Sequence, residues 1–253
     1  MAHVADARVL KEPHAFVDLA DWQMATVRDR RSDGQLVAGV DYATAALTGC
    51  ADRAVVIKPS NRASSLLPLL CRDPPTIRPL FITMGRAAFL VAVLHGGRDR
   101  LAFTARRAVH LARLFDDGDR QIAAAVATST DPLTQTANLA VLAHHLQTSL
   151  LRQVRAGRWA DSPRLDFEQV TGDLARTTLH AGAKLDLIPD ERRVWRLGSL
   201  GKHDSKQPGR AFSNAERQGE ESAIRSTYRR QIDASTGPGM RSTTMSSLVG
   251  RRR

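Results

Sequence analysis

The sequence predicts an all-α protein: an antiparallel four-helix bundle with a small outer β element and an extended basic C-terminal tail. Three observations predict this fold. Apolar residues return at three-to-four spacing in several segments before residue 160, which is typical of amphipathic helices. A proline-rich stretch separates the first two helical segments from the later ones. Basic residues are concentrated after residue 190.

The predicted organisation has three parts: an N-terminal arm (1–13), a bundle domain (14–189) and a basic extension (190–253). Residues 191–253 hold 14 Lys and Arg against 6 Asp and Glu and are rich in Gly, Ser and Thr. Such a composition predicts a largely flexible extension, because it offers little apolar surface to bury. One helix is predicted within it at 214–233, with a thin apolar stripe formed by Ala215, Ile224, Tyr228 and Ile232.

The first half of the bundle domain contains two predicted helices. The first covers 14–31 and ends at Ser32-Asp33-Gly34, and the second covers 35–48 and ends at Gly49. Prolines interrupt the segment 50–83, where short strands are predicted at 53–57 and 77–82.

The second half contains the longer helices. One begins near Met84, breaks at Gly96-Gly97 and resumes over 100–115. An acidic turn and an alanine-rich segment to Thr128 follow. The last helix is predicted to start at Thr130-Asp131-Pro132, where Asp caps and Pro occupies the first turn, and to end at Arg155.

Composition limits the possible functions. The chain of 253 residues is long enough for one good core, and its formal net charge is +11. The basic residues are mostly arginine, which favours an anionic partner such as nucleic acid. Cys50 and Cys71 are too few for a disulfide scaffold or a zinc site. No apolar run approaches a membrane span, so we expect a soluble protein of a reducing compartment without a membrane partner.

A short motif follows the last predicted helix: Arg164-Leu165-Asp166-Phe167-Glu168, an arginine, two spacers and then Phe-Glu. This R-x-x-F-E element resembles that of the coat proteins of rod-shaped helical RNA viruses, including tobamovirus, hordeivirus and benyvirus-like members. Residues 76–79 and 81–85 resemble the Arg-Phe-Pro element and Thr-Met helix start of benyvirus-type coat proteins, although Pro79 follows Arg78 directly. Residues 134–143 resemble their fourth helix. The likeness covers roughly residues 14–175 and not the basic tail.

The resemblance implies a structural coat protein that polymerises helically around single-stranded viral RNA. Its partners would be single-stranded RNA and further copies of itself, and its location the virion and, during assembly, the host cytoplasm. Arg78, Arg164, Phe167 and Glu168 would then have structural or inter-subunit roles, with Phe167 closing the outer end of the bundle. The alternative is that Phe167 is ordinary core and Arg164–Glu168 an exposed ion pair worth less than about 1 kcal/mol.

RNA binding is expected at the inner end, between the third and fourth helices. A helical coat must bind every sequence of its genome, so it needs phosphate contacts and stacking and not base-edge readout. The candidates are Arg98, Arg100, Arg106, Arg107, Arg113, Arg120, Thr134 and Asn138, of which Arg106 and Arg107 are the first choice. The alternative is that these arginines only solvate one helix face.

The acidic turn at Asp116, Asp117 and Asp119 has two interpretations. Carboxylates that repel one another across subunit contacts would act as a disassembly switch, because raised pH or lost calcium ionises them together. The alternative is a solvated turn that ends a helix. Its spacing does not complete an EF-hand loop.

No catalytic motif is found in the sequence. His144-His145 are neighbours on a helix and point in different directions, and no Walker, H-E-x-x-H, G-x-S-x-G or G-x-G-x-x-G pattern occurs. We therefore expect no enzyme, no cofactor and no metal. The competing function is that of a non-viral basic helical DNA- or RNA-binding protein, of plasmid, nucleoid or ribosome-associated type. The size of the assemblies separates the two, because only a coat protein forms very large polymers.

Overall fold

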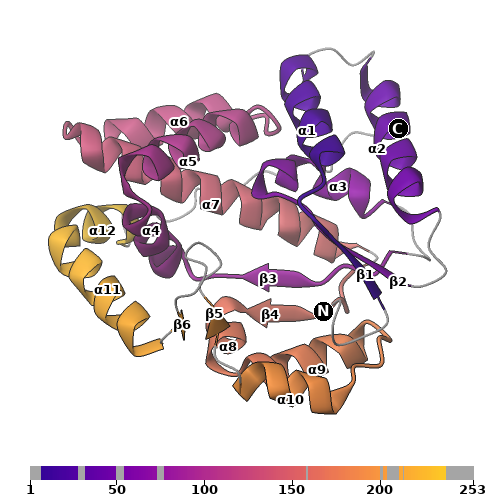
Figure 1. Cartoon of the computed structure of the whole chain (residues 1–253). Helices are drawn as coiled ribbons and strands as arrows, with labels where there is room; N and C mark the ends of the chain where they lie inside the picture. Colours follow the sequence, from indigo (N-terminus) through magenta and orange to yellow (C-terminus); the bar gives the residue numbers. More distant parts are fainter. Residues whose placement is uncertain are drawn as a thin grey trace. The chain divides into compact units, whose positions relative to one another are not determined.

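The computed structural model describes residues 7–27, 32–49, 54–72, 77–157, 159–199, 202–203, 211–212 and 214–237. The described residues are mostly helical, as predicted, with twelve α-helices and six short strands that form three two-stranded sheets (Figure 1). The chain divides into two compact units, Met1–Met84 with Leu150–Arg217 and Gly85–Ser149 with Gln218–Arg253. Two of the three boundaries fall inside helices, in α7 (Pro132–Ala156) and in α11 (Asn214–Thr227).

The first unit begins with a parallel pair of strands. β1 (Ala7–Lys11) pairs with β2 (Ala54–Lys58) over all five residues of each strand. The strand predicted at 53–57 is thus present, shifted by one residue. The prediction that residues 1–13 form an N-terminal arm is corrected for residues 7–11, which are a strand of a sheet. At the end of β2, Lys58 donates to Glu12 at 2.8 Å, and this hydrogen bond lowers the pKa of the Glu12 carboxyl.

Helices α1 (His14–Thr26) and α2 (Asp33–Thr48) supply most of the core of this unit. Residues 28–31, which were included in the first predicted helix, lie outside the described residues. The 3-10 helix η2 (Asn61–Leu66) and α3 (Leu67–Leu70) lie within the proline-rich segment 50–83. The buried core cluster consists of Phe16, Ala20, Leu36, Val40, Ala43, Ala63 and Leu66.

A second parallel pair joins segments that are far apart in sequence. β3 (Phe81–Thr83) pairs with β4 (Arg164–Asp166), and Phe81 and Leu165 are buried. The helix α8 (Phe167–Gly172) follows β4 directly. Asp166 starts it with a capping box, because its carboxylate accepts from the amide of Glu168 while Gln169 accepts from the amide of Asp166.

Four further elements of this unit were not predicted from the sequence. α9 (Leu174–Lys184) and α10 (Glu191–Ser199) lie side by side and bury Ala175 and Val194 between them (Figure 1). β5 (Lys202–His203) and β6 (Ala211–Phe212) form a short antiparallel pair.

The second unit contains α4 (Arg86–His95), α5 (Gly97–Ala112), α6 (Gly118–Ala127) and the first part of α7. Gly97 has a φ of 77°, a left-handed conformation that favours glycine and lets the chain turn between α4 and α5. The predicted break at Gly96-Gly97 is therefore confirmed. The core cluster consists of Leu90, Val91, Val93, Leu94, Leu101, Ala137, Ala140, Val141 and Ile232.

The basic extension contributes to this core. α11 and α12 (Arg229–Thr236) replace the single helix predicted at 214–233, with the break at Tyr228. Ile224 and Tyr228 pack against the cluster that contains Ile232. The prediction of a largely flexible extension is corrected for 191–199 and 214–237, because α10 packs on α9 and because Ile224, Tyr228 and Ile232 belong to the core of the second unit.

We expect Ile232→Val to lower the free energy of unfolding by about 0.5–1.5 kcal/mol, the usual cost of removing one buried methylene. Ile232 is 6% exposed, whereas Ile188 is 91% exposed, so Ile188→Val is the matched control and should change nothing. Urea unfolding followed by circular dichroism measures both. Equal effects of the two substitutions would contradict the packing of α12.

Candidate nucleic-acid interface

Helix α5 has two clearly different faces. Leu101, Ala105, Ala108 and Leu111 are buried. On the other side, Phe103, Arg106, His110 and Arg113, the arginine that caps the helix, are exposed. Their spacing of three, four and three residues confines them to one narrow arc of the helix, about 60–80° wide and about 15 Å long. We call these four residues the α5 stripe.

The structure leaves five of the predicted RNA-binding arginines accessible to solvent. Arg106 and Arg113 belong to the α5 stripe, and Arg98 and Arg100 are exposed near the start of the same helix. Arg120 is exposed on α6, which packs against α5, and its guanidinium lies 3.8 Å from the carboxylate of Asp117. The basic residues of this region therefore gather on α5, with one more on its neighbour.

The other three predicted residues, Arg107, Thr134 and Asn138, are buried, so their side chains are not exposed for contact with RNA. Thr134 donates from its hydroxyl to the carboxylate of Asp131 at 2.5 Å and so completes the cap of α7. Asn138 is 1% exposed and fully engaged in hydrogen bonds within the unit. Arg107 is 6% exposed, because it is rotated by about 100° from Arg106 toward the core side of the helix.

The sequence interpretation missed two residues of the stripe, Phe103 and His110. Phe103 is 44% exposed, which gives this basic face an aromatic ring. The signal was present in the sequence: Phe103 lies three residues before Arg106 and ten before Arg113, all on one helical face.

The acidic turn that precedes α6 does not form a carboxylate cluster. Asp117 is half-buried and accepts a hydrogen bond from Gln121 at 2.8 Å, while Asp116 and Asp119 are exposed. Within the described residues, no group of three or more His, Cys, Asp or Glu side chains could hold a metal ion. The geometry within one chain is that of a solvated turn, and a switch would require carboxylates of a second copy.

The R-x-x-F-E element is part of the second sheet. The Nε of Arg164 donates to the hydroxyl of Thr83 on the neighbouring strand at 3.0 Å, and the two described residues Arg164 and Glu168 form no ion pair with each other. Phe167 is half-buried, with the guanidinium of Arg217 5.8 Å from its ring centre. Arg78 forms an ion pair with Asp186. These residues join separate segments of the first unit.

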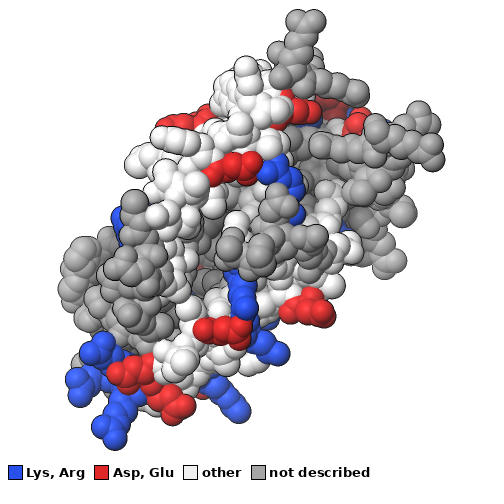
Figure 2. Space-filling model, turned by 90° about the vertical axis from the view of Figure 1, so that its right-hand side faces the viewer, with Lys and Arg blue, Asp and Glu red and all other residues white. Residues whose placement is uncertain are grey.

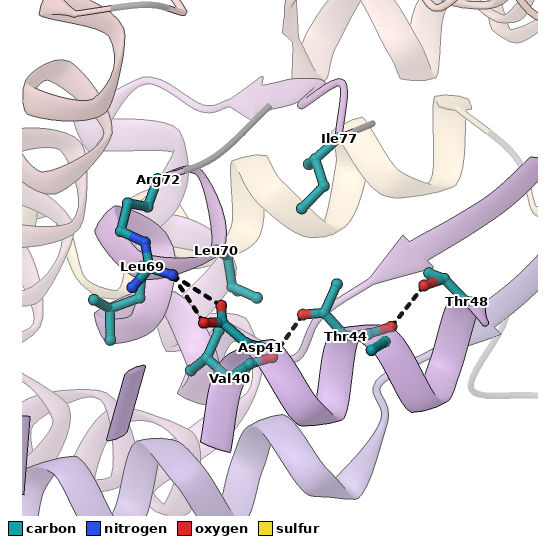
Figure 3. Close-up of a pocket in the computed structure, with 9 residues that line it drawn as sticks. Val40, Asp41, Thr44, Thr48, Leu69, Leu70, Arg72 and Ile77 are labelled. Carbon is teal, nitrogen blue, oxygen red and sulfur yellow. Dashed lines mark hydrogen bonds and ion pairs between the residues drawn. The ribbon is translucent and has the colours of Figure 1, made fainter. Parts of the chain in front are cut away.

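A pocket of about 290 Å³ lies between α2 and α3 in the first unit (Figure 3). The guanidinium of Arg72 points at Asp41 and donates to both carboxylate oxygens, at 3.0 and 2.9 Å. The hydroxyls of Thr44 and Thr48 donate to helix carbonyls. The rest of the lining is aliphatic, so the pocket contains no pairing of a nucleophile with a base.

Cys71, beside this pocket, should be unreactive. Burial raises the pKa of its thiol from 9.0 to about 11, so the thiolate fraction at pH 8 falls about 100-fold. Since the folded-state pKa is the higher one, this group's contribution to stability is present below pH 9 and is lost as pH rises through about 11. We expect slow iodoacetamide labelling of native Cys50→Ser protein and fast labelling in urea. Fast labelling of the native protein would contradict the burial.

Charges of both signs are mixed on another part of the surface. On the face shown in Figure 2, blue and red side chains of the described residues lie next to one another. The first unit contains several such pairs, including Arg62–Asp21 at 2.7 Å and Arg72–Asp41. In these pairs the carboxylate offsets the positive charge that the arginine would present to a phosphate. None of the described helices is long and apolar enough to span a membrane.

No protein-family model, no curated protein and no solved structure matches this chain.

Proposed function

We propose that this protein is a structural coat protein that polymerises helically around single-stranded RNA into a rod-like particle. The observation that carries the proposal is the pairing of β3 with β4. It joins the segment before α4 to the R-x-x-F-E element after α7, two segments 80 residues apart whose sequences both resemble rod-shaped virus coat proteins. The resemblance implies a small sheet at the outer end of the subunit, and the β3–β4 pair is a candidate for it.

The arrangement of helices along the chain also supports the proposal. In chain order, the four helical segments predicted from the sequence correspond to α1, α2, α4 with α5, and α7. The short connection after α1, the crossover through η2 and α3, and the 25-residue length of α7 agree with the order expected of such a subunit.

The α5 stripe supports the choice of RNA as partner. It offers two exposed arginines and an aromatic ring, and none of the four side chains needs to read a base edge. A coat that covers a whole genome requires that kind of contact. Assembly would take place in the host cytoplasm and the product would be the virion.

Electron microscopy of the purified full chain tests the proposal. We expect rods or stacked discs with single-stranded RNA near neutral pH, and we expect mild acid to favour assembly if carboxylates of neighbouring copies repel. Monomers or small oligomers under every condition, with and without RNA, would overturn the coat function.

The second candidate is a non-viral basic helical nucleic-acid-binding protein. One observation favours it: a single exposed helix carrying arginines also fits the major groove of a duplex. Such a protein would form defined complexes with double-stranded DNA or RNA. Sedimentation of the chain with duplex and single-stranded probes separates it from the coat function.

A further inference from the structure

Phe103 is not part of the buried core of the second unit. It projects from the exposed side of α5 at 44% exposure and is not part of the buried cluster to which Leu101 of the same helix belongs. A phenylalanine ring left half in water forgoes much of the stabilisation that burial would supply. Its position beside exposed cationic side chains therefore indicates that a ligand covers the ring.

The neighbours of Phe103 define the chemistry of that ligand. Arg106 lies one turn further along the same face, about 4.5 Å along the helix axis, and Arg113 lies about 10.5 Å beyond Arg106. An apolar protein surface over this line would strip water from the guanidinium groups without replacing their hydrogen bonds. A nucleic acid provides both parts: a flat base for the ring and phosphates for the arginines.

We propose that Phe103 stacks on an unpaired base of a single strand, while Arg106 and Arg113 hold the phosphates on its 3′ or 5′ side. The inference rests on the proposed function and names the binding mode of that same interface. The strand is single because a base in a duplex is already stacked on both faces and costs a few kcal/mol to extrude. Phenylalanine has no hydrogen-bonding group, so it accepts every base, as a genome-wide coat requires.

The test compares two probes that carry the same phosphates. One is a fluorescent oligoadenylate, and the other is an abasic phosphodiester strand of equal length. Phe103→Leu removes the aromatic ring but keeps an apolar side chain and good helix propensity. We expect it to weaken binding of oligoadenylate by the full-length protein about 5- to 150-fold, the range equivalent to loss of one base–aromatic stack, and to leave binding of the abasic strand unchanged.

Two variants serve as controls. Phe103→Tyr keeps a stacking ring and should retain the affinity for oligoadenylate. Tyr42→Leu removes another exposed aromatic ring, 77% exposed on α2, and should affect neither probe. Circular dichroism verifies the fold of each variant. Unchanged binding of oligoadenylate by Phe103→Leu, or an equal loss for both probes, would overturn the stacking role.

The two proposals fail separately. Base-dependent loss of affinity without any rods or discs would keep the stacking role of Phe103 and reject the coat function. Rods that form normally with a Phe103→Leu subunit whose affinity for oligoadenylate is unchanged would keep the coat function and reject the stacking role.

Discussion

Replacing Arg106 and Arg113 together by glutamine should abolish most of the affinity for single-stranded RNA at physiological salt. Both side chains are exposed on the α5 stripe, and each is expected to neutralise one phosphate. Loss of two such contacts should reduce the slope of log K against log salt by about 1.4, because each phosphate contributes about 0.7 for a single strand. Fluorescence anisotropy over a salt series measures the affinity and the slope together.

A matched control separates a local contact from net charge. Arg176 on α9 and Arg192 on α10 are also exposed, and Arg176→Gln with Arg192→Gln removes the same two charges from the first unit. Glutamine is a good helix former, so neither double variant should lose helicity. The control should leave the slope nearly unchanged. If both pairs weaken binding equally, the interaction is with the overall charge and α5 is not the interface.

Helical periodicity predicted the positions of most helices because it depends on neighbours three and four residues away. The helices α2, α6 and α7 start or end within a few residues of their predicted limits. The same local pattern could not tell Arg106 from Arg107. One residue of offset turns a side chain by about 100°, and which side is buried depends on the partners that α5 finds in the folded unit.

The sequence pattern could not predict which distant segments pair with one another. Short strands were predicted at 53–57 and 77–82, but their partners, β1 and β4, are separated from them by long stretches of chain. The extension shows the opposite error. Its composition predicted flexibility, yet a few apolar residues on one helical face are enough to bury Ile232 in the second unit.

Asn138→Ala should lower the free energy of unfolding by about 2–4 kcal/mol, the largest stability effect expected of any single substitution proposed for this chain. The Asn138 amide donates to the carbonyl of Ala125 at 3.0 Å and to the hydroxyl of Thr128 at 2.7 Å. Its carbonyl accepts from the hydroxyl of Ser235 at 2.6 Å, and Ser235 is fully buried. Alanine would remove these contacts and leave buried polar groups without partners. Urea unfolding measures the loss.

A double-mutant cycle with Ser235→Ala tests whether Asn138 holds α12 on α7. Ser235→Ala alone should cost about 1 kcal/mol, and Asn138→Ala should cost less in that background, because the hydroxyl it would otherwise strand is already absent. A coupling of about 0.5–3 kcal/mol is expected for residues in one hydrogen-bond network. If the costs of the two substitutions are strictly additive, Asn138 stabilises only its contacts with Ala125 of α6 and with Thr128 at the end of α6. In that case Ile232, and not this hydrogen bond, attaches the basic extension to the second unit.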